Sequence, residues 1–220
     1  MLFAVGSTMT FDTEHPKFAS VHYRAAADGS TVWQTVDPVN DYTRSFVRQR
    51  WRSLVLTSYF PQLGTRQTFV GGAPSANVPG PRLRVLADTV VGDHRTVRLR
   101  SRRDAAVMSL LVHTVVGSLT ATVEGQRLGA HDTTLLDGTT VRWAGDYYAP
   151  PREGIDAVLR FAAGPPVLLR AVDLTYGLPA GLAGRYPARP AGMLTGRLGD
   201  CTLAETTLRL PSAGRPAAAD

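Results

Sequence analysis

Cysteine and lysine are nearly missing from this 220-residue chain. Cys201 is the only cysteine, which excludes an intramolecular disulfide and leaves the redox compartment open. We expect a buried, inert thiol, because a reactive cysteine needs a positioned base and an electropositive setting that the sequence does not display. Lys17 is the only lysine, so the net charge of +6 comes almost entirely from arginine. The arginines are spread along predicted strands without interleaved aromatic residues, which argues against specific nucleic-acid binding.

Clear targeting and membrane signals are also missing. The apolar residues 1–6 lack a basic leader and are too short for a signal peptide, so they predict a first strand or the remainder of an upstream segment. The run Ala105–Val123 is uncharged and nearly long enough to span a bilayer. Its β-branched residues, together with Gly117-Ser118, favour two buried strands joined at that dipeptide over a membrane helix.

The sequence contains no G-x-S-x-G elbow, no Walker loop and no G-x-G-x-x-G after a strand. Its five histidines are scattered singly, whereas a catalytic metal needs several converging ligands. We therefore expect no catalytic residue, no metal ligand and no cofactor in this chain. His113, among apolar residues, is expected to be a hydrogen-bonded core histidine. A hydrolase is an alternative, because Asp146 and Glu153 could face each other across a cleft as the two carboxylates of a glycosidase.

One short acidic segment is a candidate cation site. Asp12, Glu14 and His15 bring three possible ligands within four residues. An extended loop rarely turns fast enough to use all three on one ion, so we favour a solvated turn that ends at Pro16.

One group of aromatic residues is a candidate ligand site. Trp143, Tyr147 and Tyr148 lie close together near the end of a predicted strand, and exposed rings of this kind stack on sugars. Core packing is the favoured interpretation, because aromatic side chains supply much of the buried area of a sandwich.

The fold class follows from composition and alternation. An apolar fraction of 44% with 19% charged residues is typical of a folded globular chain. Val97 and Leu99 alternate with Arg98 and Arg100, which predicts a strand with one solvated face. The other predicted strands are 21–26, 31–36, 82–87, 119–124, 139–143, 155–161, 167–176 and 202–210. Short strands separated by turns predict an all-β fold, a β-sandwich or jelly-roll-like arrangement, mostly antiparallel, with at most one or two short helices.

We expect a single β-sandwich domain over residues 1–210. At this size, folding buries roughly 70% of the surface of the unfolded chain, which is enough for a core without disulfides. The expected parts are an irregular N-terminal part (1–59) with a hairpin at Asp28-Gly29 and a short helix over 41–47, a Gly/Pro-rich connection (60–81), the main strands (82–210) and a disordered tail (211–220).

Six parts of the sequence carry a family resemblance. They are Phe11–Pro16, the pair Tyr23 and Trp33 around Asp28-Gly29, Arg95–Ser101, Gly154–Asp156 leading to Leu159–Phe161, Tyr176–Pro179, and Asp200–Leu208. In order and spacing they resemble the region that follows the transmembrane helices in membrane-bound M28 zinc metallopeptidases. That group includes vacuolar and endoplasmic-reticulum metallopeptidases and actinobacterial relatives.

The resemblance implies a β-sandwich on the extracytoplasmic or luminal side of a membrane protein. The zinc ligands of the family, an H-x-D, a Glu-Glu pair and further Asp and His residues, belong to a separate domain. They have no match here: His131 is followed directly by Asp132, and no two Glu residues are adjacent. The expected function is therefore a non-catalytic accessory domain whose partners are the peptidase and transmembrane portions of a parent protein. A glycan- or envelope-binding module is the alternative, and a self-standing hydrolase is third.

Overall fold

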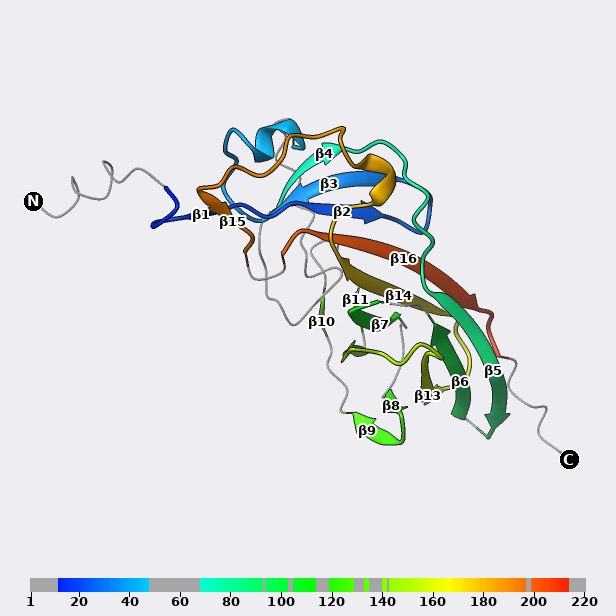
Figure 1. The fold of residues 1–220 in the computed structure, drawn as a ribbon. Helices are drawn as coiled ribbons and strands as arrows, with labels where there is room; N and C mark the ends of the chain where they lie inside the picture. Colours follow the sequence, from blue (N-terminus) through cyan, green and yellow to red (C-terminus); the bar gives the residue numbers. More distant parts are fainter. Residues whose placement is uncertain are drawn as a thin grey trace, which may run out of the picture.

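The computed structural model describes residues 12–47, 68–92, 94–102, 105–113, 119–128, 133–134, 140–141, 143–196 and 199–213. Over these residues the chain is an all-β sandwich with mostly antiparallel sheets, which confirms the predicted fold class (Figure 1). Among the described residues, the helical parts are two single 3-10 turns, η1 (Thr43–Ser45) and η4 (Ala180–Leu182). No helix in the described part of the chain has the length and apolar character needed to cross a membrane.

The larger sheet has seven strands in the order β12-β7-β14-β16-β2-β3-β4. Their bounds are β12 (Trp143–Tyr148), β7 (Val107–His113), β14 (Val167–Tyr176), β16 (Cys201–Leu210), β2 (His22–Ala25), β3 (Thr31–Thr35) and β4 (Phe69–Gly72). All neighbours are antiparallel except β16 and β2, which run parallel. The last described strand, β16, thus lies beside β2, so segments near the two ends of the described sequence share one sheet.

The smaller sheet has five antiparallel strands in the order β5-β6-β13-β8-β9. They are β5 (Arg82–Val91), β6 (His94–Arg102), β13 (Ile155–Ala162), β8 (Thr120–Val123) and β9 (Gln126–Leu128). A bulge between Val85 and Ala87 shifts the register of β5 against β6. Two short pairs complete the fold: β1 (Lys17–Phe18) with β15 (Met193–Leu194), and β10 (Thr133–Thr134) with β11 (Thr140–Val141).

The main core lies between the two sheets. Inward residues of the smaller sheet, such as Val97, Leu159 and Phe161, pack in one cluster with Met108 and Leu169 of the larger sheet. Because side chains alternate along each strand, the residues between these positions point away from the core. The period of two seen in the sequence therefore describes this sheet correctly.

A second core covers the β2-β3-β4 end of the larger sheet. Tyr23 and Trp33 meet edge to face with ring centroids 5.1 Å apart, and Phe46 and Tyr186 pack against the same indole. The indole N–H of Trp33 donates a hydrogen bond to the Tyr186 hydroxyl at 2.7 Å. The loop that contains η1 and the chain that follows η4 thus cover the part of the sheet that the five-stranded sheet does not reach (Figure 1).

Several local predictions can be compared with the structure. The run Ala105–Val123 forms the strands β7 and β8, as expected, with Gly117-Ser118 outside the described residues. The hairpin at Asp28-Gly29 is present, and Gly29 has the positive φ of +82° that such a turn requires. The predicted helix over 41–47 is only the 3-10 turn η1, and Asn40, not Asp41, accepts the hydrogen bonds from its first N–H groups.

Two segments are more structured than the sequence predicted. β4 lies inside the stretch 60–81 that was expected to be a connection, because Phe69–Gly72 pairs in register with Val32–Thr35 of β3. In the segment 211–220, the carbonyl of Pro211 accepts a hydrogen bond from Arg95 at 2.5 Å, and the amide of Ala213 donates one to Gly164 at 3.1 Å. Residues 214–220 lie outside the described part.

Candidate functional site

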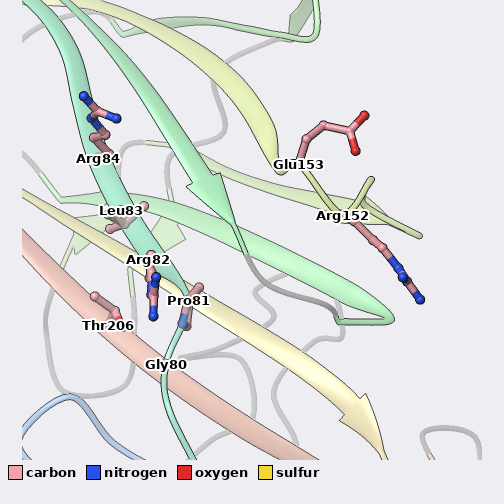
Figure 2. A pocket seen from close by; sticks show the side chains of 8 residues that line it. All are labelled: Gly80, Pro81, Arg82, Leu83, Arg84, Arg152, Glu153 and Thr206. Carbon is pink, nitrogen blue, oxygen red and sulfur yellow. The ribbon is translucent and has the colours of Figure 1, made fainter.

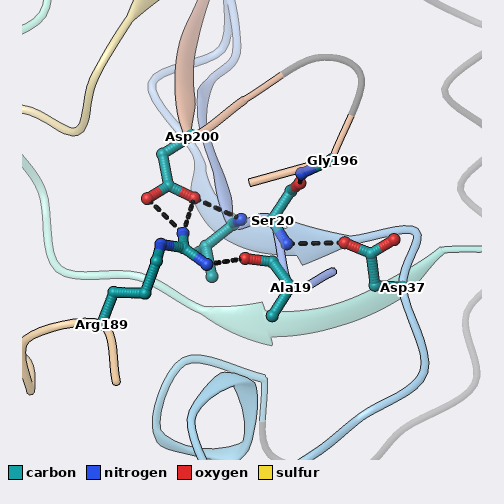
Figure 3. A network of polar contacts seen from close by, with 7 residues as sticks. Ala19, Ser20, Asp37, Arg189, Gly196 and Asp200 are labelled. Carbon is teal, nitrogen blue, oxygen red and sulfur yellow. Dashed lines mark hydrogen bonds and ion pairs between the residues drawn. The ribbon is translucent and has the colours of Figure 1, made fainter. Parts of the chain in front are cut away.

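A guanidinium–carboxylate network holds the start of β2 in place (Figure 3). Nη2 of Arg189 lies 2.6 Å and 2.5 Å from the two carboxylate oxygens of Asp200. Oδ1 of Asp200 also accepts the amide N–H of Val21 at 2.9 Å, and Nη1 of Arg189 donates to the carbonyl of Ala19. Charge-assisted hydrogen bonds of this kind are about twice as strong as neutral ones.

The same network extends to two further segments. The amide of Ser20 donates to Asp37 Oδ2 at 2.6 Å, and the Ser20 hydroxyl accepts the amide N–H of Gly196 at 2.6 Å. The guanidinium of Arg189 also lies 4.8 Å from the ring centroid of Tyr42. Residues 19–21, the loop around 37–42 and the segment 189–200 are thereby joined, so these polar groups are engaged in holding the scaffold together.

An Arg-Glu-Arg triad lies on the face of the larger sheet that points away from the smaller sheet. Arg170 approaches both carboxylate oxygens of Glu205, at 3.0 Å and 3.3 Å, and Arg24 lies 3.6 Å from the same carboxylate. All three side chains are largely buried. Removal of one member of such a group leaves an uncompensated buried charge, which is strongly destabilising.

A row of buried side chains crosses the sheet beside this triad. Cys201 pairs in register with His22, and His22 with Gln34, so their side chains lie on one face. Burial lowers the pKa of His22, against the opposing effect of Asp200 and Asp37, and burial raises the pKa of the Cys201 thiol. A catalytic cysteine needs the reverse, a thiolate beside an imidazolium. The expectation of a buried thiol at Cys201 is confirmed.

Asp146 is a half-buried acid. It lies on β12 opposite Ser109 of β7, whose hydroxyl donates to Asp146 Oδ1. Burial raises the pKa of Asp146, and the hydrogen bond from Ser109 partly opposes this effect. Its proposed dyad partner Glu153 lies in the turn before β13 and is exposed. The two acids therefore occupy different surroundings, since Asp146 is half-buried in the sheet and Glu153 is exposed in a turn.

The three candidate aromatic residues are separated by the alternation of β12. Trp143 is only 1% exposed and belongs to the main core, where its ring lies so close to Gly145 that a Cβ there would be 2.7 Å from it. Tyr147 packs partly against the same core, whereas Tyr148 is 67% exposed. Of the three rings, Tyr148 is the most accessible to a sugar in solution.

The candidate cation cluster forms a turn. Oδ1 of Asp12 accepts the amide N–H groups of Glu14 and His15 at 2.9 Å and 2.7 Å, and these bonds lower the pKa of Asp12. Nδ1 of His15 lies 3.4 Å from the same oxygen. The solvated turn that the sequence suggested accounts for these contacts. Across the described residues there is no group of three His, Cys, Asp or Glu side chains placed to hold a metal ion.

A groove of about 980 Å³ opens where β5 begins (Figure 2). Gly80–Arg84 and Thr206 form one side, and Arg152 and Glu153 extend from the turn before β13. The chain passes close to β16 here, since a Cβ on Gly80 would lie 2.3 Å from Thr206 Oγ1 and 2.6 Å from the carbonyl oxygen of Glu205. Arg82 and Arg84 give the β5 side of the groove a positive charge.

The buried polar groups are what sequence reasoning missed. Arg24, Arg170 and Glu205 are ordinary outward positions of alternating strands in the sequence, and nothing local shows that the three strands are neighbours. Asp200 and Arg189 stand in a Gly/Pro-rich region that the sequence describes as loop. The side chain of His113 and the residues Phe11, His131 and Asp132 lie outside the described part.

No protein-family model matches the chain, and no curated protein is significantly similar to it.

Proposed function

We propose that this chain is a non-catalytic accessory domain that packs on the peptidase or membrane portion of an M28-type metallopeptidase and supports it. The proposal implies an extracytoplasmic or luminal location. It also implies that zinc belongs to the separate peptidase domain of the parent protein.

The observation that carries the proposal is that segments of the family resemblance contact one another. The amide of Gly177 donates to the carbonyl of Asp200 at 2.8 Å, and the Thr202 hydroxyl donates to the carbonyl of Gly177 at 2.8 Å. Tyr176–Pro179 is therefore bound to Asp200–Leu208. These sequence features serve packing, which is what a supporting domain requires.

Two other segments of the resemblance meet in the smaller sheet. Arg95–Ser101 and Gly154–Phe161 run side by side as β6 and β13, and Arg98 Nη2 lies 2.8 Å from Asp156 Oδ2. Gly154 has a φ of +96°, which glycine adopts without strain. The segments on which the resemblance rests thus correspond to strands and turns of one scaffold, and this supports the proposal.

Association with the peptidase portion tests the function. The chain and the peptidase portion of the parent protein are expressed as separate tagged polypeptides, and co-purification is measured along with peptidase activity and melting temperature. We expect association, and a peptidase portion that is less stable or less active when this domain is deleted. Absence of association together with unchanged activity would remove the accessory role.

A glycan-binding module is the second candidate, favoured by the exposure of Tyr148 at the end of β12. Tyr148→Ala is the variant that tests it, because Trp143→Ala would damage the core. A glycan array on which the unaltered chain binds and Tyr148→Ala does not would support this candidate. Equal signals from both proteins, or none from either, would count against it.

A further inference from the structure

The outer face of the five-stranded sheet is basic. Val97, Ala157, Leu159 and Phe161 point into the core, so the alternate positions of these strands point outward. Arginines occupy outward positions on four of the five strands and are all exposed: Arg82 and Arg84 on β5, Arg98 on β6, Arg160 on β13 and Arg127 on β9.

The arginines extend across the whole width of the sheet. Arg98, Val158, Thr122 and Arg127 form one continuous cross-strand row, from β6 through β13 and β8 to β9. Arg160 lies one row away, between Thr96 and Thr120 in register. Five strands at roughly 4.8 Å spacing span about 19 Å, so the cations are spread over an area and not aligned along one groove.

Most of this positive charge is not compensated within the protein. Arg98 is paired with Asp156, whose amide N–H in turn donates to the carboxylate of Glu124. The other four arginines, Arg82, Arg84, Arg127 and Arg160, form no ion pair with any residue that the structure describes. Long side chains that carry unpaired charge on one face produce a local positive potential.

The shape and chemistry of the face indicate which anionic partner fits. Single-stranded nucleic acid is held by aromatic rings stacked on its bases, but outward positions between the arginines are Thr120, Thr122 and Val158. A linear polyanion would follow one row of cations, whereas a planar anionic surface contacts all rows together. Val91, 78% exposed at the far end of β5, adds an apolar side chain on the same face.

We propose that the outer face of the β5-β6-β13-β8-β9 sheet docks on a bilayer surface that contains anionic phospholipids. Each arginine near such a surface contributes about 1 kcal/mol, and the attraction weakens within a Debye length as salt is added. The inference goes beyond the accessory role and does not rest on it, since it depends on the charge of the face alone.

Vesicle co-sedimentation tests the proposal. The full chain is mixed with vesicles of phosphatidylcholine alone or with phosphatidylglycerol, at low and high salt. The double variant Arg84→Gln, Arg160→Gln removes two cations from the face. The matched control Arg185→Gln, Arg209→Gln removes two exposed arginines located elsewhere. Circular dichroism and melting temperature check that all three proteins are folded.

We expect salt-sensitive binding to the phosphatidylglycerol vesicles only. The face variant should bind roughly 30-fold more weakly, as two contributions of about 1 kcal/mol imply, and the control should bind almost as the unaltered chain does. Three results would overturn the proposal: no binding by the unaltered chain, equal losses in both double variants, or tighter binding to soluble polyphosphate than to vesicles at equal phosphate concentration.

Discussion

At the scale of single residues, a substitution at Gly80 tests how closely the chain passes β16. A side chain there would collide with Thr206 Oγ1 and with the backbone carbonyl of Glu205. We expect Gly80→Ala to lower the free energy of unfolding by about 1–3 kcal/mol, the usual cost of overpacking. The control Gly181→Ala adds a Cβ with no atom within 4 Å and should be close to neutral. If urea denaturation gives the same change in the free energy of unfolding for Gly80→Ala and Gly181→Ala, the chain at Gly80 lies farther from β16 than described.

A substitution of Asp200 tests the polar network at the start of β2. Asp200→Asn removes the charge that Arg189 binds in a partly buried position, so we expect a loss of about 2–3 kcal/mol in the free energy of unfolding. The exposed pair Arg44–Asp41 is the comparison, because its atoms are 3.4 Å apart and its side chains are 61% and 96% exposed. Asp41→Asn should change stability by less than about 0.5 kcal/mol. A similar, small loss in both variants would contradict a structural role for Asp200.

Asp146 gives a pH-dependent prediction. Burial raises its pKa above the ordinary value of 3.8, so its ionisation costs folding free energy, and stability falls as the pH rises through the raised pKa. Asp146→Asn cannot ionise and can still accept the hydrogen bond from Ser109. We expect this variant to be more stable than the unaltered chain at neutral pH and to lose that advantage below about pH 4. If the variant is less stable at neutral pH, the stronger hydrogen bond from Ser109 to the ionised carboxylate outweighs the free-energy cost of burying that charge.

At the scale of elements, Tyr186 anchors the segment after η4 on the sheet. Tyr186→Phe keeps the ring, which stacks on Phe46 at 4.5 Å, but leaves the buried indole N–H of Trp33 without its acceptor. We expect a loss of about 1–3 kcal/mol and faster hydrogen exchange in residues 178–193. Tyr176→Phe is the control, since Tyr176 is an exposed ring. If residues 178–193 exchange at the same rate in Tyr186→Phe and in Tyr176→Phe, the Tyr186 hydroxyl does not hold this segment on the sheet.

The alternation of β13 and β14 made these strands predictable almost to the residue. β4 was missed because only Phe69 and Val70 mark it before Gly71-Gly72, and a two-residue apolar signal is too short to distinguish from a loop. The parallel pairing of β16 with β2 was also not predictable, because partners far apart in sequence are chosen by packing of the whole sheet. In place of the predicted short helix there is only η1, whose first N–H groups donate to Asn40 and not to Asp41.

At the scale of the whole molecule, the seven-stranded sheet connects both cores, so the protein should unfold as one unit. Trp33 lies in the aromatic core and Trp143 in the core between the sheets, and each is fully buried. With Trp51 replaced by phenylalanine in both, we expect variants that keep only Trp33 or only Trp143 to show one transition each, at which fluorescence and circular dichroism coincide. Two transitions at different urea concentrations would show that the two cores unfold separately, which would contradict the predicted single domain of residues 1–210.

The candidate sites were less predictable than the fold. Alternation alone already implied that Trp143 and Tyr148 point to opposite faces of β12, and the structure buries the first and exposes the second. The outward arginines of β6 were predicted to lie on a solvated face. That Arg84, Arg127 and Arg160 lie on the same face of the sheet depends on strand order. Strand order is set by contacts between distant segments, and a single sequence does not display it.

The central claim, that this chain supports a peptidase and performs no hydrolysis itself, is tested most directly by zinc content and aminopeptidase activity of the purified chain. We expect less than stoichiometric zinc and no cleavage of an aminoacyl reporter, with or without added zinc. One zinc ion per chain, with turnover that a chelator abolishes, would contradict the accessory role and mean that this chain builds a metal site of its own.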